Sequence, residues 1–185
     1  MKKIKINIIV KFVVTLFLLC TLLGIVFYFN SKPDLGLYID SFMKRLSNTH
    51  QNVFILNIGV ICLIFVSSLI VVGLPLSYLY LCYEGFTIGF TLCAFVSQNK
   101  INGLLFYILF LLLSKLIQII INMFFIVTST KYAVNIIPSL LNKNKEKIYR
   151  SLVYQFYRFA MILLLTILNS TFIYFFVNKI LVHFV

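Results

Sequence analysis

Charged residues are scarce in this sequence of 185 residues. Asp, Glu, Lys and Arg make up 11% of it, whereas 62% of the residues are hydrophobic. A water-soluble globule of this size needs more polar surface than that, so a soluble fold is excluded. Several apolar runs follow one another, and about 20 such residues suffice to cross a bilayer as a helix. The composition therefore predicts an integral membrane protein.

Motifs of soluble catalysis and of metal binding are also missing. The sequence contains no G-x-S-x-G, no H-E-x-x-H and no P-loop. His50 and His183 have no Cys, Asp or second His at the spacing of metal ligands. The cysteines show no C-x-x-C spacing and fall within apolar runs, as small apolar fillers do; they are Cys20, Cys62, Cys82 and Cys93. We therefore expect no enzyme, no metal site and no cofactor.

Acidic residues are the rarest charged group. There are 4 of them against 16 Lys and Arg, which gives a net charge of +12. Such an excess can indicate nucleic-acid binding, but here the basic residues cluster at the ends of apolar runs. The positive-inside rule and attraction to anionic lipids account for that placement. The sequence therefore predicts anionic lipid as a partner and no nucleic acid.

Five apolar segments are predicted to be transmembrane helices. They cover residues 12–29, 53–72, 76–97, 104–127 and 159–177. The first exceeds the usual length of a signal-peptide core and is followed by no small-residue cleavage site, so it is interpreted as a retained signal anchor. The predicted fold is an all-α integral membrane protein with about five transmembrane helices.

The basic clusters predict the orientation of this single membrane domain. Lysines flank the first span, and the strongest positive cluster follows the fourth, so both are expected in the cytoplasm. The C-terminus is then extracytoplasmic, and Pro138 is expected to end the helix before the basic cluster. The predicted parts are a basic N-terminus and signal anchor (1–29), an extracytoplasmic amphipathic loop (30–52), a three-span core (53–127), a basic cytoplasmic loop (128–158), and the last span and tail (159–185).

The extracytoplasmic segment 30–52 carries apolar residues at helical spacing. This spacing predicts a short amphipathic helix outside the membrane. Two interpretations stay open: the helix lies in the lipid interface, or it contacts a partner protein. The apolar residues are Leu35, Ile39, Phe42, Met43 and Leu46.

Glycine and proline mark the stretch 73–90. Gly73 and Pro75 are expected to form a cytoplasmic turn between two antiparallel spans, since both residues break helices; a re-entrant segment is the alternative. Gly85 and Gly89 lie four residues apart, so on a helix they form a strip against which another helix can pack closely. The fourth span is predicted to be that helix. Gly103 opens that fourth span after a short external turn.

A carboxylate and an amine are predicted inside the bilayer. Glu84 lies near the centre of the third span and Lys115 near the centre of the fourth, at depths that match within about one helical turn, roughly 5 Å. Each alone costs on the order of 3 kcal/mol there, and pairing offsets much of that. We therefore predict a Glu84–Lys115 ion pair. The alternative is that each side chain separately reaches water or headgroups.

Uncharged polar side chains also recur within the predicted spans. In membranes such groups commonly hydrogen-bond between helices, and a polar path for an ion or a small solute is the alternative. The residues are Asn57, Ser67, Ser68, Thr87, Thr91, Ser114, Gln118, Asn122, Asn169, Ser170 and Thr171.

The motifs of the stretch 73–90 resemble those of the stage II sporulation protein M family. The resemblance is carried by Gly73-Leu-Pro75, by Glu84-Gly-Phe-Thr-Ile-Gly-Phe90 and by Gly103, and extends more loosely over about residues 50–180. The chain departs from the family where Glu84 replaces a basic residue and where Leu113-Ser114-Lys115 replaces a proline-containing turn. An acidic residue and a proline are also missing around 169–176. It is therefore identified as a divergent member.

The resemblance implies a non-enzymatic membrane scaffold. Such a protein would localise or organise membrane-anchored cell-wall hydrolases during septal peptidoglycan remodelling and engulfment in sporulation, in the septal or forespore-engulfing membrane. Self-association of the chain is left open. The alternative function is a small permease or transporter subunit in which Glu84 and Lys115 line a polar intramembrane pathway.

Overall fold

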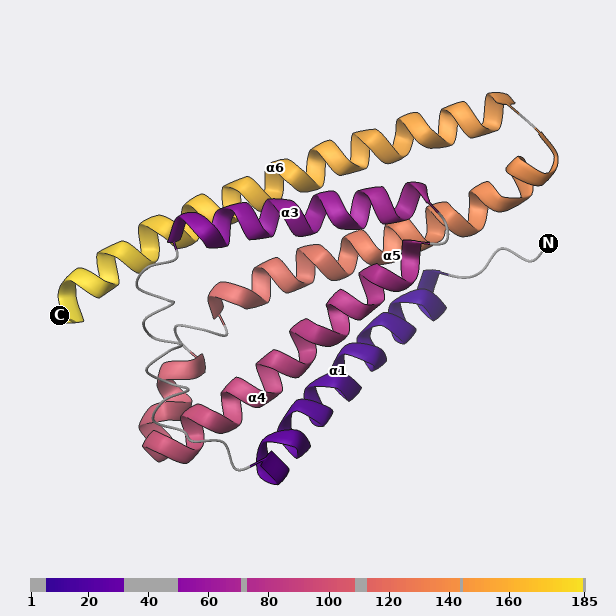
Figure 1. Ribbon diagram of the computed structural model, residues 1–185. Helices are drawn as coiled ribbons and strands as arrows, with labels where there is room; N and C mark the ends of the chain where they lie inside the picture. The colour runs from indigo at the N-terminus through magenta and orange to yellow at the C-terminus, as the bar shows by residue number, and fades with distance from the viewer. Residues whose placement is uncertain (1–5, 32–49, 71–72, 109–112, 144, 185) are drawn as a thin grey trace.

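The computed structural model describes residues 6–31, 50–70, 73–108, 113–143 and 145–184 (Figure 1). These residues form α-helices, and the predicted all-α fold is confirmed. The helices are α1 (Ile6–Ser31), α3 (His50–Leu69), α4 (Leu74–Phe106), α5 (Leu113–Leu141) and α6 (Lys145–Phe184).

Four of these helices are long and apolar enough to cross a membrane. Their spans are Asn7–Ser31, Leu74–Ser97, Lys115–Leu141 and Lys145–Phe172. The apolar part of α3, Phe54–Leu69, is shorter, although the whole helix of 20 residues is about 30 Å long at 1.5 Å per residue. The predicted second span therefore has a shorter apolar stretch than the other four helices. With four helices able to cross a membrane, the chain is a multi-pass membrane protein.

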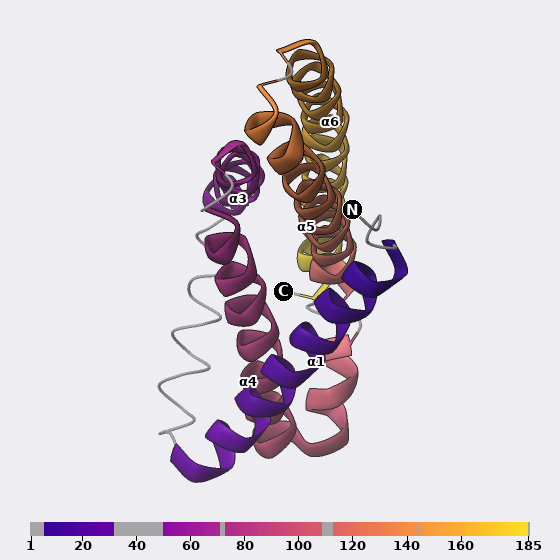
Figure 2. The ribbon, with the colours of Figure 1, turned by 90° about the vertical axis from the view of Figure 1, so that its right-hand side faces the viewer.

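The helices form two groups that share one core. α1 and α4 lie side by side and run in the same direction, while α3, α5 and α6 pack together above them (Figures 1 and 2). All five helices contribute buried apolar side chains to the core, among them Val13, Ile64, Leu81, Phe125 and Ile162. The outward faces are apolar too, as expected for helices surrounded by lipid.

The turn between α3 and α4 lies where it was predicted. The Gly73 amide donates a hydrogen bond of 2.6 Å to the Ile70 carbonyl, and α4 then runs back alongside the bundle (Figure 1). A Cβ on Gly73 would lie 2.9 Å from the Ser67 Cα, so the turn needs glycine for close approach. Pro75 lies in the first turn of α4, where its missing N–H has no helical partner to lose. The stretch 73–90 is thus a turn and a helix rather than a re-entrant segment.

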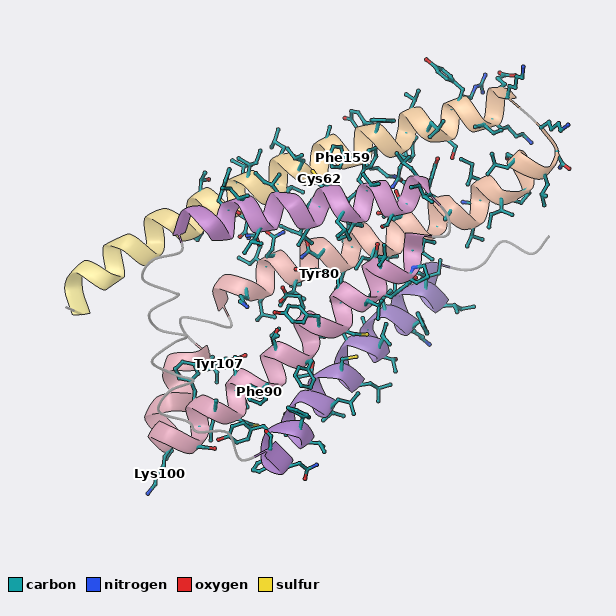
Figure 3. All side chains as sticks on the ribbon, in the orientation of Figure 1. Cys62, Tyr80, Phe90, Lys100, Tyr107 and Phe159 are labelled. Atoms are coloured by element: carbon teal, nitrogen blue, oxygen red, sulfur yellow. The ribbon has the colours of Figure 1, made fainter. Side chains whose placement is uncertain are left out.

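A second reversal occurs at Lys100, at the lower tip of α4 (Figure 3). Lys100 has φ 48° and ψ −126°, so the helical ladder is interrupted there and a short piece containing Gly103 runs back. The external turn was predicted at this point. The span after it was not placed correctly, since the long helix begins only at Leu113 instead of residue 104.

The predicted basic cytoplasmic loop 128–158 is largely helical, and Pro138 does not end the preceding helix as was predicted. α5 continues one turn beyond Pro138 to Leu141, and α6 begins at Lys145. A proline in the last turn removes one hydrogen bond only, so it does not end the helix at once. The backbone N–H of Asn142 donates a hydrogen bond of 3.0 Å to the Pro138 carbonyl. Lys143, with φ 50°, completes the tight turn. The basic residues therefore lie on α5, on α6 and in the turn between them.

The start of α1 and the end of α6 lie at opposite ends of the bundle (Figure 1). The α5–α6 turn lies at the same end as the start of α1, so the two predicted cytoplasmic clusters share one end of the molecule. Which membrane face this end occupies stays a prediction. Of the predicted amphipathic segment 30–52, residues 32–49 lie outside the described residues.

Candidate functional site

The closest helix contact joins α1 to α4 through glycine. A Cβ on Gly24 would collide with the backbone oxygen of Phe86, and a Cβ on Gly89 would collide with that of Thr21. At Gly85 an added Cβ would lie 2.8 Å from a backbone oxygen of α1. Because three glycines stand at the contact, the two backbones approach as closely as small-residue interfaces in membranes allow.

The partner predicted for the glycine strip was wrong. Gly85 and Gly89 were expected to face the fourth span, but they face α1. Glycine spacing identifies a surface that accepts a close neighbour, yet it does not identify the neighbour. A signal was present in the first span, where Thr21 and Gly24 form a second small-residue strip one helical turn long.

Glu84 finds its hydrogen-bond partner within its own helix. Its Oε1 accepts a hydrogen bond of 2.8 Å from the hydroxyl of Tyr80, one turn earlier in α4. The Tyr80 side chain lies between α4 and α5 (Figure 3). The carboxylate is half-buried, so one charge-assisted hydrogen bond replaces part of its hydration.

A directional chain of hydrogen bonds leads from α6 through α5 to this carboxylate. Asn169 Nδ2 donates to Gln118 Oε1 at 3.2 Å, and Gln118 Nε2 donates to Asn122 Oδ1 at 3.1 Å. Asn122 Nδ2 donates to the Tyr80 hydroxyl at 3.4 Å, which itself donates to Glu84. We call these five residues the amide chain. Every donor points toward Glu84, so the bond dipoles add and hold three helices in one register.

Lys115 does not take part in the amide chain. It lies in the first turn of α5 with an exposed side chain, and no ion pair joins it to Glu84 among the described residues. The reason is depth: the span runs from 115 to 141 instead of 104–127, so its midpoint moves by about 12 residues, roughly 18 Å along the axis. An ion pair that does form joins Arg150 to Glu146 at 2.6 Å on the exposed start of α6.

A second polar cluster surrounds Gln155 near the end of the bundle that carries the basic residues. The side chain is fully buried, and its Nε2 donates to the hydroxyls of Ser68 and Ser129, each at 3.1 Å. Gln155 thereby connects α6 to α3 and α5. Its Oε1 has no partner within the described part of the chain. Two further pairs connect α4 to its neighbours: Ser67 with Ser77, and Tyr78 with Thr130.

The predicted hydrogen bonding between helices is confirmed for seven of the polar side chains. They are Asn57, Ser67, Ser68, Gln118, Asn122, Asn169 and Ser170. Sequence reasoning missed Tyr80 and Gln155. A signal existed for Gln155, because steps of four and three residues place it on one face of α6 with Phe159, Ile162 and Asn169.

The described side chains of the bundle interior pack against one another and form hydrogen bonds. No group of three or more His, Cys, Asp or Glu side chains comes together there in a way that could hold a metal ion. A pocket of about 270 Å³ lies between α1 and α4, lined by Cys20, Leu23, Cys82, Tyr83 and Phe86. The polar side chains of the bundle interior point to one another, which suits an arrangement that fixes helices in place.

These features define a polytopic α-helical membrane protein in which several interior polar side chains hydrogen-bond between helices. The family model for Stage II sporulation protein M matches residues 13–180, most of the chain. The chain therefore belongs to the stage II sporulation protein M family and is a sporulation-related, multi-pass membrane protein. No curated protein and no solved structure matches it.

Proposed function

We propose that this protein is a non-enzymatic membrane scaffold that localises or organises cell-wall hydrolases during septal peptidoglycan remodelling and engulfment. It would act in the septal or forespore-engulfing membrane. Membership of the stage II sporulation protein M family supports a role in sporulation. The finer role rests on the internal pairing described above.

The amide chain is the observation that supports a static framework. Its bonds join three helices, and the Gln155 cluster adds α3. A scaffold must present partner-binding surfaces at fixed positions, and buried polar networks hold helices in one register. A framework built this way leaves the binding of partners to the segments outside the bundle.

Two parts of the chain are proposed to bind partners. Residues 30–52 contact the membrane-anchored hydrolases through the apolar face predicted from the sequence. The α5–α6 turn and the adjoining parts of these two helices carry Lys131, Lys143, Lys145, Lys147 and Arg158, and bind anionic lipid of the inner leaflet. Arg158 also lies 4.2 Å from the ring centroid of Tyr154, an arrangement suited to the membrane interface.

Crosslinking and pull-down from sporulating cells test the scaffold role. We expect the full-length protein to recover a membrane-anchored cell-wall hydrolase. Replacing Leu35, Ile39 and Phe42 together by serine should reduce recovery about tenfold or more, the change produced by losing about 1.4 kcal/mol of binding. Hydrolase in the eluate is measured by mass spectrometry, with the membrane level of the bait held equal.

The matched control replaces polar residues of the same segment. Ser41→Ala combined with Ser47→Ala changes the same loop without removing apolar surface, and recovery should stay at the wild-type level. Recovery of no cell-wall hydrolase by the wild-type protein would overturn the scaffold proposal. Equal recovery by the wild type and the triple serine variant would remove residues 30–52 as the contact.

A small transporter subunit is the second candidate, and the end of the amide chain on a carboxylate within the span is the observation that favours it. Glu84→Gln distinguishes the two functions. The amide keeps an oxygen that can accept the Tyr80 hydrogen bond, so a scaffold should retain its membrane level and its sporulation efficiency within about twofold. A carrier that moves a proton on Glu84 should lose its activity, because glutamine does not change its protonation state.

Glu84→Leu is the companion variant for this test. It removes the acceptor, so Tyr80 loses its partner and the folded fraction should fall. Sporulation is counted as heat-resistant spores. Loss of sporulation in Glu84→Gln at a normal protein level would favour the carrier and count against the scaffold.

A further inference from the structure

Two cysteine side chains meet where α1 contacts α4. Cys20 is buried, and Cys82 is half-buried. Both are free thiols. Both also line the pocket of about 270 Å³ between these helices.

The register of the two helices explains why the thiols meet. Gly24 faces Phe86 so closely that a Cβ could not be accommodated. Cys20 and Cys82 each precede these residues by four positions, one turn back on both helices. Since α1 and α4 are parallel, the same close spacing holds there. The Cys20 Cβ accordingly lies 3.3 Å from the place where a Cβ on Gly85 would be.

A disulfide between two helices requires a close helix contact of this kind. A disulfide needs Cα atoms about 4.4–6.8 Å apart, with Cβ atoms that face each other. Helix backbones come that near only where small residues line the interface, as Gly24, Gly85 and Gly89 do.

The pocket gives a lipid-soluble reagent access to the thiols. Its other lining residues are Leu23, Tyr83 and Phe86, and the side chains of Leu23 and Tyr83 are 60% and 64% exposed on the outside of the bundle. Cys62, by contrast, lies on α3 (Figure 3). The structure therefore singles out one pair of cysteines.

We infer that Cys20 and Cys82 form a redox modification site that ties α1 to α4. An organic peroxide oxidises one thiol to a sulfenic acid and leaves as the alcohol. The second thiol attacks that sulfur, the S–S bond forms, and water leaves. In total, two S–H bonds and one O–O bond break, two electrons pass to the peroxide, and one alcohol and one water are released. The inference does not rest on the scaffold role.

The experiment uses the full chain in membrane vesicles with a protease site inserted between Ser31 and His50. The vesicles are treated with cumene hydroperoxide, cleaved, and run on denaturing gels with and without reductant. We expect most of the oxidised protein to keep its two fragments joined until dithiothreitol separates them. Uncleaved oxidised protein should migrate as a monomer, because the bond forms within one chain.

Single serine variants provide the controls. Cys20→Ser and Cys82→Ser should each abolish the linkage, whereas Cys62→Ser and Cys93→Ser should keep it. Mass spectrometry of the wild-type protein gives an independent readout, a crosslinked peptide pair containing Cys20 and Cys82 with two hydrogens lost. Separation of the wild-type fragments after oxidation, or linkage through another cysteine, would overturn the inference.

Discussion

Gly89→Leu is expected to destabilise the protein by roughly 3 kcal/mol or more, because a side chain at this position meets backbone rather than a movable side chain. Even a Cβ at Gly89 would collide with the Thr21 carbonyl oxygen of α1. The two helices must then separate, and the neighbouring contacts at Gly24 and Gly85 are lost with them. Thermal unfolding of the detergent-solubilised protein measures the effect, together with the yield of folded protein from membranes.

Gly59→Leu is the matched control for this prediction. Gly59 lies in α3, also within an apolar helix, but nothing approaches within 4 Å of the place where its Cβ would be. The same substitution there should leave the unfolding temperature unchanged or slightly higher, since leucine is a better helix former than glycine. Equal loss of stability at Gly59 and Gly89 would contradict the assignment of the close contact to α1 and α4.

Gln118→Leu is expected to cost about 1–2 kcal/mol of stability. Gln118 is the second residue of the amide chain and bonds on both sides, so its loss leaves the Asn169 amide without an acceptor and the Asn122 carbonyl without a donor. Both partners are at least 90% buried, and water cannot readily replace the missing bonds. Unfolding of the solubilised protein by heat or denaturant measures the loss.

A double-mutant cycle separates the amide chain from general packing. Asn169→Leu and Gln118→Leu remove two ends of one hydrogen bond, so their combined cost should be smaller than the sum of the single costs. Thr171→Val is the control, since this exposed hydroxyl donates only to the Leu168 carbonyl of its own helix and should change stability by less than about 0.5 kcal/mol. Strict additivity would count against direct coupling.

The α1–α4 pair is held together by other interactions than the group formed by α3, α5 and α6. α1 is attached to α4 through close backbone approach at glycine, supported by aromatic contacts such as Tyr28 with Phe90 at 5.4 Å. Helices α3, α5 and α6 are joined instead by hydrogen bonds between side-chain amides and hydroxyls. A larger side chain at the α1–α4 contact should therefore separate α1 from α4. Replacing an amide of the amide chain by an apolar side chain should weaken the packing of α5 against α6.

The boundaries of the last two spans could not be predicted correctly from hydropathy. The basic cluster at 128–158 was assigned to a cytoplasmic loop by the positive-inside rule. In the structure these residues lie on α5, on α6 and in the turn between them, and several fall within the apolar stretches Lys115–Leu141 and Lys145–Phe172. A charged residue excludes a position from the lipid core, but it does not end a helix. Lys115 was predicted near mid-span because the fourth span was placed at 104–127, whereas the apolar stretch runs from Lys115 to Leu141.

By itself, the sequence determined the all-α membrane class, the reversals at Gly73 and Lys100, the family and the presence of a glycine strip. All of these depend on local composition or on motifs within a short stretch. Only the tertiary structure decided that the strip faces α1, that Glu84 bonds to Tyr80, and that Gln118 and Asn169 meet. The physical reason is that hydropathy is nearly the same for every apolar helix, whereas the choice of neighbour depends on the sum of many small contacts between particular faces.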